Sequence, residues 1–557
     1  QTLTVTSDAF LSVSMSVTPT FVASTLNITS SGTTNGSFIE GVFQSNTSST
    51  ANILNSDLVS AMTQRSILVE STGAINVQAN VVSSTAASGL TLKAGTDVVV
   101  NDSIQVTTNN GPAVFWSRSG STQNQGTQSG EGRIRFGNGV TVNTSGGAIV
   151  LAGSSSVDSN GLPNGAAYVN ATAFAIQLGT NTSTGTNVEL LSGGGQIRLY
   201  GETGSGSSAK QAFAGNVGPS NSIVVNSGTG TQDWRFVSAN TTDNVYEVWG
   251  GNLLATSAAP ANPSTPAINV FIRSISATST FTPIQQVADR TNRFIATGTG
   301  DVNVEVTSAN ATPFAVDDAE GLQFLANGGS VNVNFGANGI DLSTASATNP
   351  IIFGAVSGSS STSRVSITAD RFGTGTVASG LVVRTSGQVA VQPAANIFSA
   401  DQTFNSTWSF VGNGGLTIGK TGNTRAVTVS GANSVAGNLN VIGGAIAING
   451  NQTTTSSGNI VITSSGAYTG SGTLTSAGTL TINGSSTVGP TAAISTTGNI
   501  AISSSGNFTN SGANITSSSG SVQITTTGSA TTVVTGNVQA TTGSIAFSSA
   551  GAYSGAG

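Results

Sequence analysis

Residues 458–472 read GNIVITSSGAYTGSG, residues 498–512 read GNIAISSSGNFTNSG, and residues 543–557 read GSIAFSSAGAYSGAG. In each word a glycine is followed by apolar residues at alternate positions. Alternation of this kind predicts β-strands, and the Gly, Ser and Asn residues between the apolar positions favour turns. Units with this pattern begin at Gly437, Gly458, Gly478, Gly498, Gly520 and Gly543, with spacings of 21, 20, 20, 22 and 23 residues.

A fixed period of about 20 residues, with one such unit in each period, is typical of a solenoid. A coil of this length holds two or three short strands and their corners. Stacked coils pair each strand with its equivalent about 4.8 Å away and bury the apolar positions in a continuous core. The sequence therefore predicts an all-β fold, a parallel β-solenoid with coils of about 20 residues and with loop insertions.

The composition limits the chemistry of the chain. Charged residues make up 7% of the 557 residues, the net charge is −6, and there is no cysteine and no histidine. The weak negative charge argues against a nucleic-acid partner, which needs a basic patch. The missing side chains exclude disulfides, thiolate chemistry and histidine general bases. No apolar run is long enough for a transmembrane segment, and no motif predicts a cofactor.

The repeat pattern also divides the chain into segments. Strand-like residues without a clear period begin the chain, and the coil pattern starts near Gly73 with loops expected at 109–131 and 154–170. The predicted segments are an N-terminal cap or assembly segment at 1–72, β-solenoid with projecting loops at 73–219, an irregular or inserted region at 220–297, β-solenoid at 298–436, and regular repeats at 437–557.

The region 220–297 differs because aromatic and charged residues are frequent there and prolines stand at 260, 263 and 266. Proline cannot donate to a strand ladder, so these residues predict an interruption of the coils. Two interpretations are open, a large corner insertion or irregular set of coils, and an embedded binding module.

The last word, GAYSGAG at 551–557, matches GAYTGSG at 466–472, which continues directly into another coil. We therefore expect a truncated last coil, completed by more of the natural chain or by the next subunit of a fibre. A start at Gln1 rather than Met predicts a mature chain after removal of an export signal, or a fragment.

Clustered carboxylates and arginines are the candidates for catalysis. Polysaccharide cleavage would need paired carboxylates on one face of adjacent coils, whereas the alternative is solvated charge on the outer face, and we expect no enzyme. The groups are Glu131 with Arg133 and Arg135, Glu189 with Arg198 and Glu202, and Asp233 with Arg235, Asp243 and Glu247. The acidic run Asp317, Asp318 and Glu320 lacks the spacing of known calcium loops, so no metal site is predicted.

Four tryptophans are candidate ligand or interface residues, Trp116, Trp234, Trp249 and Trp408. All four stand outside the most regular repeats. Aromatic rings on a surface stack on sugars or anchor protein interfaces. The alternative is that they pack beneath long loops.

The words GNIVITSSGAYTGSGTLTSAGTLTI, from residue 458, and SGLTLKAGTDVVVNDSIQV, from residue 88, resemble the repeats of filamentous haemagglutinin-like adhesins of Gram-negative bacteria. The resemblance extends over most of the chain from about residue 73 and is strongest after residue 437. It implies a right-handed parallel β-helix that is exported to the cell surface and acts in adhesion, aggregation or biofilm formation. The Asn-Pro-Asn-Gly and Asn-Pro-Asn-Leu words of that family's secretion domain do not occur.

Pattern and resemblance together predict an extracellular structural and adhesive rod on a bacterial surface. Its expected partners are itself, through end-to-end or lateral association, or glycans and proteins of a host or neighbouring cell. The first alternative is a self-polymerising subunit of a filament, sheath or S-layer. The second is a β-helix enzyme that cleaves polysaccharides.

Overall fold

The fold is seen in a computed structural model that describes residues 22–120, 132–170, 173–206, 210–279, 281–285, 290–310, 314–317, 321–342, 350–356, 363–373, 381–404, 409–411 and 414–555. The chain divides into two compact units, Gln1–Pro313 (unit 1) and Phe314–Gly557 (unit 2). In both units short strands alternate with turns, and each strand pairs with strands from the preceding and following coils.

Unit 1 contains three sheets, which the chain visits in the same order in every regular coil. The first sheet comprises β2 (Gly36–Ile39), β3 (Val42–Ser45), β5 (Ile67–Ser71), β8 (Leu90–Ala94), β11 (Ala113–Ser117), β14 (Ile149–Val157), β19 (Ile197–Thr203), β22 (Gln232–Ser238), β25 (Ile268–Ser274) and β28 (Val302–Ser308). The second comprises β4 (Thr50–Leu54), β1 (Thr25–Thr29), β6 (Ala74–Val77), β9 (Val98–Val100), β12 (Ile134–Phe136), β17 (Ile176–Leu178), β20 (Phe213–Asn216), β23 (Tyr246–Trp249) and β26 (Ile284–Gln285). The third comprises β7 (Val81–Ala86), β10 (Gln105–Asn109), β13 (Thr141–Asn143), β18 (Val188–Leu191), β21 (Ser222–Asn226), β24 (Asn252–Ser257) and β27 (Asn292–Ala296).

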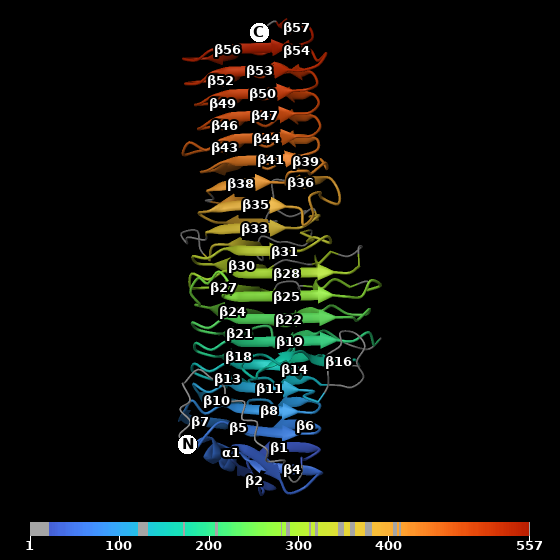
Figure 1. The fold of residues 1–557 in the computed structure, drawn as a ribbon, viewed down its shortest axis with the longest axis vertical. Helices are drawn as coiled ribbons and strands as arrows, with labels where there is room; N and C mark the ends of the chain where they lie inside the picture. Colours follow the sequence, from blue (N-terminus) through green and yellow to red (C-terminus); the bar gives the residue numbers. More distant parts are fainter. Residues whose placement is uncertain are drawn as a thin grey trace. The chain divides into compact units, whose positions relative to one another are not determined.

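Pairing between coils is parallel and in register. Strand β22 pairs with β19 on one side and with β25 on the other, from Gln232 to Ser238 without a shift. In Figure 1 the labelled first-sheet strands of unit 1 point to the right while the chain ascends from β5 to β28, which is a right-handed winding. The predicted parallel β-solenoid is confirmed.

The start of unit 1 departs from the coil pattern. Strands β2 and β3 form an antiparallel hairpin, and the helix α1 (Asn55–Met62) follows β4. Leu58 and Met62 on α1 are fully buried against the neighbouring strands β4, β5 and β7. Within the described ranges there is no helix long and apolar enough to cross a bilayer.

The region 220–297 does not interrupt the solenoid as its composition predicted. Strands β21 to β27 continue all three sheets, and β22 and β25 are among the longest of unit 1. The strands continue because Pro260, Pro263 and Pro266 all lie in the connection between β24 and β25, where no ladder needs their N–H groups. Coils here are longer than the C-terminal repeats, since Asp233 and its neighbour Asn269 in the next coil are 36 residues apart.

Unit 2 also stacks three strands per regular coil. Its first sheet comprises β31 (Val331–Asn334), β33 (Arg364–Thr368), β35 (Gln388–Gln392), β38 (Gly415–Ile418), β41 (Leu439–Gly443), β44 (Ile460–Ser464), β47 (Leu480–Gly484), β50 (Ile500–Ser504), β53 (Val522–Thr526) and β56 (Ile545–Ser549). The second comprises β36 (Gln402–Phe404), β39 (Val427–Val429), β42 (Ile446–Ile448), β45 (Tyr468–Gly470), β48 (Val488–Pro490), β51 (Phe508–Thr509), β54 (Thr532–Val534) and β57 (Tyr553–Gly555). The third comprises β40 (Asn433–Val435), β43 (Gln452–Thr454), β46 (Leu474–Ser476), β49 (Ile494–Thr496), β52 (Ile515–Ser517) and β55 (Val538–Ala540).

The remaining strands of unit 2 belong to its less regular first coils. Strand β29 (Val316–Asp317) bridges Ile340, which in turn bridges Phe372. The other strands form one parallel ladder, β30 (Leu322–Ala326), β32 (Ile351–Gly354), β34 (Leu381–Arg384) and β37 (Ser409–Val411).

The glycine that opens each repeat unit marks a close approach between coils. A Cβ atom added at Gly437 would clash with the backbone of Gly414, one at Gly458 with Gly437, and one at Gly543 with Gly520. The glycines therefore stand above one another at one corner of the stack. The sequence pattern of glycine followed by alternating apolar residues reflects this corner and the inward side chains of the strand after it.

Asparagine side chains bridge successive coils at the same corner, directly after the stacked glycines. The amide oxygen of Asn459 accepts the backbone N–H of Thr479 at 2.7 Å, and that of Asn499 accepts the N–H of Ser521 at 2.8 Å. A corner N–H that no strand can satisfy is thus bonded by the coil below. The frequent Asn residues of the repeats have a structural role.

We expect Asn499→Ala to lower the free energy of unfolding by about 1 kcal/mol, because it leaves the Ser521 N–H without its acceptor. The matched control is Gln523→Ala, an exposed outward residue on the next coil. Urea unfolding of the full chain followed by circular dichroism measures both. Equal midpoints for the two variants would show that the Asn499 bond contributes nothing.

Candidate functional site

The three described tryptophans lie in three different environments. Trp234 on β22 is fully buried, Trp116 on β11 is half-buried, and Trp249 at the end of β23 is 43% exposed. Trp408 lies outside the described residues. The three described tryptophans therefore do not form one site, and among them only Trp249 combines an exposed ring with a polar neighbourhood.

Trp234 belongs to the core. Its ring packs against Phe213, Phe236 and Phe294 with centroid distances of 5.8, 6.2 and 5.3 Å. Its indole N–H donates to the side chain of Gln232 at 3.0 Å, so the buried polar atom is satisfied. Packing, not ligand binding, accounts for this residue.

Trp116 packs beneath a loop. The chain after β14 turns back in a hairpin with β15 (Pro163–Gly165), and the Trp116 indole donates to the Ser154 carbonyl at 2.6 Å. The hairpin covers an apolar cluster on the outer face of the first sheet, made of Val114, Val150, Ala152 and Leu162. The loop predicted at 154–170 therefore folds onto the sheet, continuing as β16 (Ala167–Val169) beside β19. Most of the other predicted loop, residues 121–131, lies outside the described residues.

The three charge groups predicted from the sequence do not assemble as groups. Several of their members instead form ion pairs with residues outside the group. Arg133 pairs with Asp97 at 2.8 Å, and Arg198 on β19 pairs with Asp158 of the hairpin at 2.8 Å. Glu189 lies on β18 in the third sheet, apart from Arg198 in the first sheet. Glu131 and the side chains of Asp317, Asp318 and Glu320 lie outside the described residues. Among the side chains that the structure describes, no three acidic groups converge as metal ligands do.

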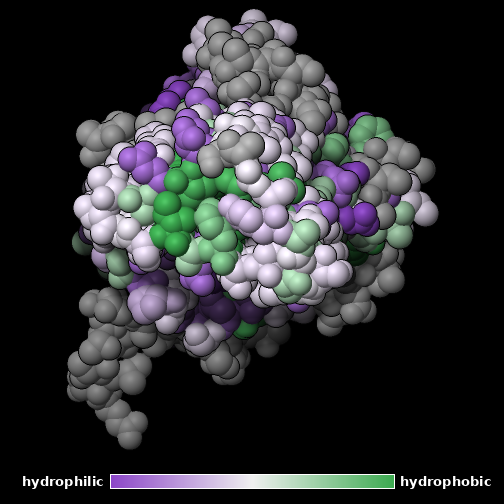
Figure 2. Space-filling model, turned by 90° about the horizontal axis from the view of Figure 1, so that it is seen from above, coloured by the Kyte–Doolittle hydropathy of each residue, from purple (hydrophilic) through white to green (hydrophobic). Residues whose placement is uncertain are grey.

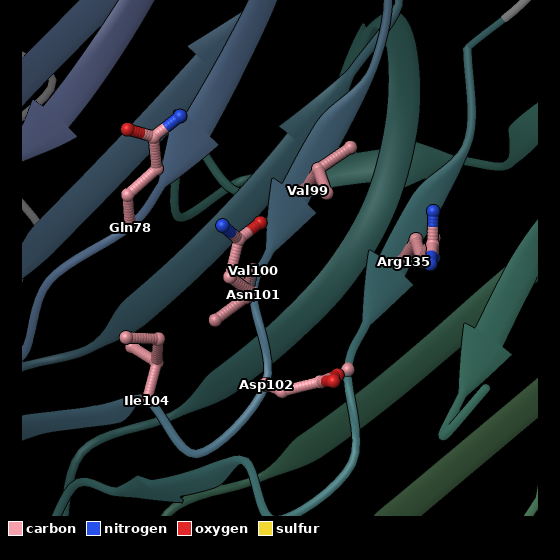
Figure 3. A pocket seen from close by; sticks show the side chains of 8 residues that line it. Gln78, Val99, Val100, Asn101, Asp102, Ile104 and Arg135 are labelled. Atoms are coloured by element: carbon pink, nitrogen blue, oxygen red, sulfur yellow. The ribbon is translucent and has the colours of Figure 1, made fainter. Parts of the chain in front are cut away.

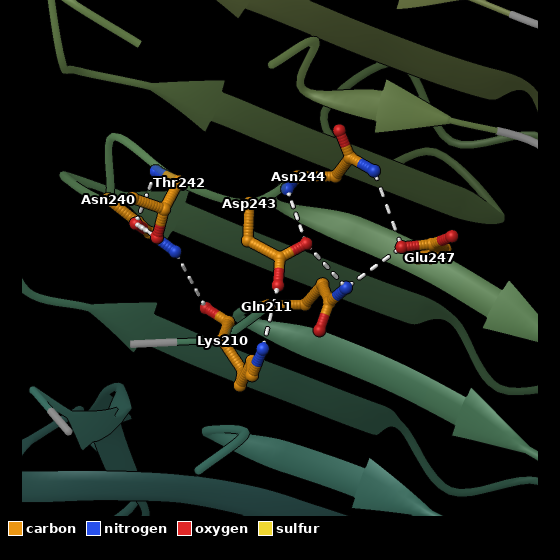
Figure 4. A network of polar contacts seen from close by, with 7 residues as sticks. All are labelled: Lys210, Gln211, Asn240, Thr242, Asp243, Asn244 and Glu247. Atoms are coloured by element: carbon orange, nitrogen blue, oxygen red, sulfur yellow. Dashed lines mark hydrogen bonds and ion pairs between the residues drawn. The ribbon is translucent and has the colours of Figure 1, made fainter. Parts of the chain in front are cut away.

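The last group separates into two places. Asp233 and Arg235 lie on β22, on the outer face of the first sheet, whereas Asp243 and Glu247 lie at β23 in the second sheet. Asp243 and Glu247 do meet, because the side-chain N–H₂ of Gln211 donates to both carboxylates at 2.8 Å (Figure 4).

A polar network surrounds this pair. The Asn244 side chain donates to Glu247 at 3.3 Å, and the Lys210 ammonium lies 3.7 Å from Asp243 (Figure 4). Glu247 is 3% exposed and Gln211 is 2% exposed. Burial raises the pKa of Glu247 to about 7, against hydrogen bonds from Asn244, Gln211 and Trp249 that lower it. Two carboxylates that share one donor could act as a general acid and its partner, but at this burial a substrate could not reach them.

Because the pKa of Glu247 is raised in the folded state, we expect the free energy of unfolding to depend on pH. The folded state holds this proton up to about pH 7, whereas the unfolded chain releases it near pH 4.5. Between these values the folded state binds more protons, so stability falls as the pH rises, by about 2–3 kcal/mol between pH 5 and pH 8. Tryptophan fluorescence melts at pH 5 and pH 8 should show this difference, and Glu247→Gln should reduce it. If the stability of wild type and of Glu247→Gln changed equally with pH, the raised pKa of Glu247 would be contradicted.

A surface groove of about 380 Å³ lies at the corner between the second and third sheets of unit 1 (Figure 3). Arg135 lines it from β12, and the Asp102 carboxylate reaches the segment that follows β12, where it accepts the Asn138 N–H at 2.8 Å. The groove is shallow, and several of its lining residues are well exposed. Its lining residues are Gln78, Val99, Val100, Asn101, Asp102, Ile104, Arg135 and Gly137.

Comparison with protein-family models, with curated proteins and with solved structures finds no match.

Proposed function

We propose that the chain is an extracellular structural and adhesive β-solenoid rod on a bacterial surface, which mediates adhesion, aggregation or biofilm formation. The observation that carries the proposal is the unbroken register of the coils. From β41 to β56 each first-sheet strand pairs with the next residue by residue. Each coil contacts only its neighbours, so such a protein becomes longer when coils are added, and each added coil makes the same kind of contacts as the coils before it.

The distribution of charge supports a mechanical role. From Ala426 to Gly557 the sequence contains no Asp, Glu, Lys or Arg. In unit 1 several charged side chains are used in ion pairs, such as Lys93 with Glu70 at 2.9 Å. A surface of hydroxyl and amide groups is hydrated but offers no ionisable catalyst, which favours a structural role over an enzyme.

Immunogold electron microscopy of the producing cells, with antibody against unit 2, tests the proposal. We expect label on thin projections from the envelope, and deletion of the gene should reduce cell aggregation. Label confined to the cytoplasm, or unchanged aggregation together with unlabelled envelopes, would rule the proposal out.

Self-association is a second candidate function, favoured by the repetition of one coil pattern from β41 to β56, which lets coils of different chains match one another. Ile545, Phe547 and Tyr553 on β56 and β57 are 43%, 37% and 53% exposed, although their equivalents in the preceding coils are buried. Figure 2 is viewed from this end and shows hydrophobic surface that is not covered by polar residues. Such a face can be covered by a further coil, either of the same chain or of another one.

Sedimentation velocity of the purified chain at increasing concentration tests this candidate. Concentration-dependent oligomers should disappear in the double variant Ile545→Ser and Phe547→Ser. The control Thr481→Ser, on the outer face of an interior coil, should leave them unchanged. A monomer at all concentrations would exclude self-association through this face.

A further inference from the structure

The outer face of the first sheet in unit 1 carries a column of large side chains on four successive coils. Tyr200, Arg235, Phe271 and Glu305 stand at equivalent positions on β19, β22, β25 and β28. These strands lie side by side in Figure 1, and strand spacing places successive side chains about 4.8 Å apart. Tyr200, Arg235 and Phe271 are partly exposed, and Glu305 is exposed.

A second column runs beside the first, two residues earlier on each strand. It consists of Arg198, Asp233, Asn269 and Asn303. The Asp233 carboxylate accepts the Tyr200 hydroxyl and, at 2.9 Å, the Asn269 side-chain N–H. The Arg198 guanidinium lies over the Tyr200 ring with 5.4 Å to its centroid. These contacts hold Tyr200, Asp233 and Asn269 in a fixed arrangement before any ligand arrives.

Phe271 is at the centre of the exposed part of this face. The Arg235 guanidinium lies on one side, 5.9 Å from the Phe271 ring centroid, and Glu305 follows on the next coil. Neither Arg235 nor Glu305 forms an ion pair within the described part of the chain. An apolar ring is therefore flanked by a planar donor and by a carboxylate acceptor that are both open to a ligand.

The corresponding face of unit 2 lacks these features. Its outer column from β41 to β53 is Asn440, Val461, Thr481, Ala501 and Gln523. There is no aromatic ring and no charge in that column. The solenoid alone does not require such residues on its outer face, so the columns on β19 to β28 need another explanation.

We infer that this face, centred on Phe271 with Arg235 and Glu305, binds a neutral polysaccharide. The inference rests on the proposed adhesive function, for which it names the class of partner. The apolar face of a sugar ring packs on the Phe271 ring, while its hydroxyl groups accept from Arg235 and donate to Glu305. A linear chain laid along the column meets a new side chain at each coil.

The equal numbers of positive and negative side chains on this face favour a neutral partner. The outward positions of the two columns carry two arginines, Arg198 and Arg235, and two carboxylates, Asp233 and Glu305. A polyanion would meet Asp233 and Glu305, and a polycation would meet Arg235. A hydroxyl-rich neutral chain satisfies donors and acceptors alike and brings no charge that lacks a partner.

Affinity electrophoresis of the full chain tests the inference, in gels that contain a neutral β-glucan, galactomannan or arabinoxylan, or the acidic polygalacturonate. We expect at least one neutral polymer to retard the chain and the acidic polymer not to. Phe271→Ala should weaken binding about ten-fold, and Arg235→Lys, which keeps the charge but loses the planar fork, should also weaken it. Phe271→Tyr should retain it.

The matched control is Thr481→Ala, at the outward column of unit 2, which should change affinity by less than about two-fold. Circular dichroism melts establish that the variants fold, since Phe271 points outward between the inward Val270 and Ile272. No retardation by any neutral polymer, retardation by polygalacturonate alone, or full binding by Phe271→Ala would each overturn the inference. Immunogold microscopy tests the proposed function independently of glycan binding, because a chain that binds no glycan can still form labelled projections.

Discussion

Trp234→Ala should destabilise unit 1 by about 3–5 kcal/mol, since it removes a fully buried ring and leaves a cavity among aromatic neighbours. The ring contacts Phe213, Phe236 and Phe294, which come from three different strands, β20, β22 and β27. Its loss therefore affects all three sheets, in three successive coils. Urea unfolding of the full chain measures the effect.

The control is Trp249→Ala, on the next strand along the chain but 43% exposed. Its expected cost is about 1 kcal/mol or less, chiefly from the lost hydrogen bond to Glu247. Similar costs for the two variants would mean that Trp234 is not the centre of the packing. Polysaccharide binding should be lost in neither folded variant, because neither ring lies on the face with Phe271.

Gly437→Ala should be the most damaging small substitution in unit 2, with an expected cost of about 3 kcal/mol. The added methyl group would clash with the backbone of Gly414 in the coil below, and neither backbone can move without breaking the ladder between β38 and β41. A shift of the melting temperature in circular dichroism would report this loss.

Gly489→Ala provides the matched control in the same unit. The nearest atom to its added methyl group is 3.8 Å away, which is an ordinary contact. We therefore expect a change within about 0.5 kcal/mol. If Gly437→Ala were equally harmless, close approach between coils would not be the reason for the stacked glycines. They would then only reflect the glycine-rich composition of the repeats.

The fold could be predicted from the repeats because the same residue types return at the same place in each coil. Gly458 and Gly498 each begin a strand whose inward residues are apolar, as with Ile460 and Ile500. The region 220–297 concealed the same pattern, because its longer coils lengthen the period and bring aromatic residues into the core. Alternation in QDWRFVS, residues 232–238, already places Trp234 and Phe236 on one face and could have indicated a strand.

The binding face could not have been predicted in the same way. Tyr200, Arg235 and Phe271 come from three different coils and are far apart in the sequence. Their alignment depends on the lengths of the intervening turns, which sequence patterns do not fix. Asp243 and Glu247 come from one short loop and strand, but the Gln211 side chain that joins them comes from the preceding coil. To predict which residues of different coils align in a column, one must know the register in which the strands pair.

Stacked coils also determine how unit 2 responds to force. The backbone hydrogen bonds that join β44, β47 and β50 point along the stacking direction, so tension in that direction loads one interface after another. Coils then detach singly, and each releases about 20 residues, or roughly 70 Å of extended chain. Tension along the strands instead loads many bonds at once in shear. A tether built from such coils lengthens in nearly equal steps when pulled from its end, and absorbs work at each step before the chain as a whole gives way.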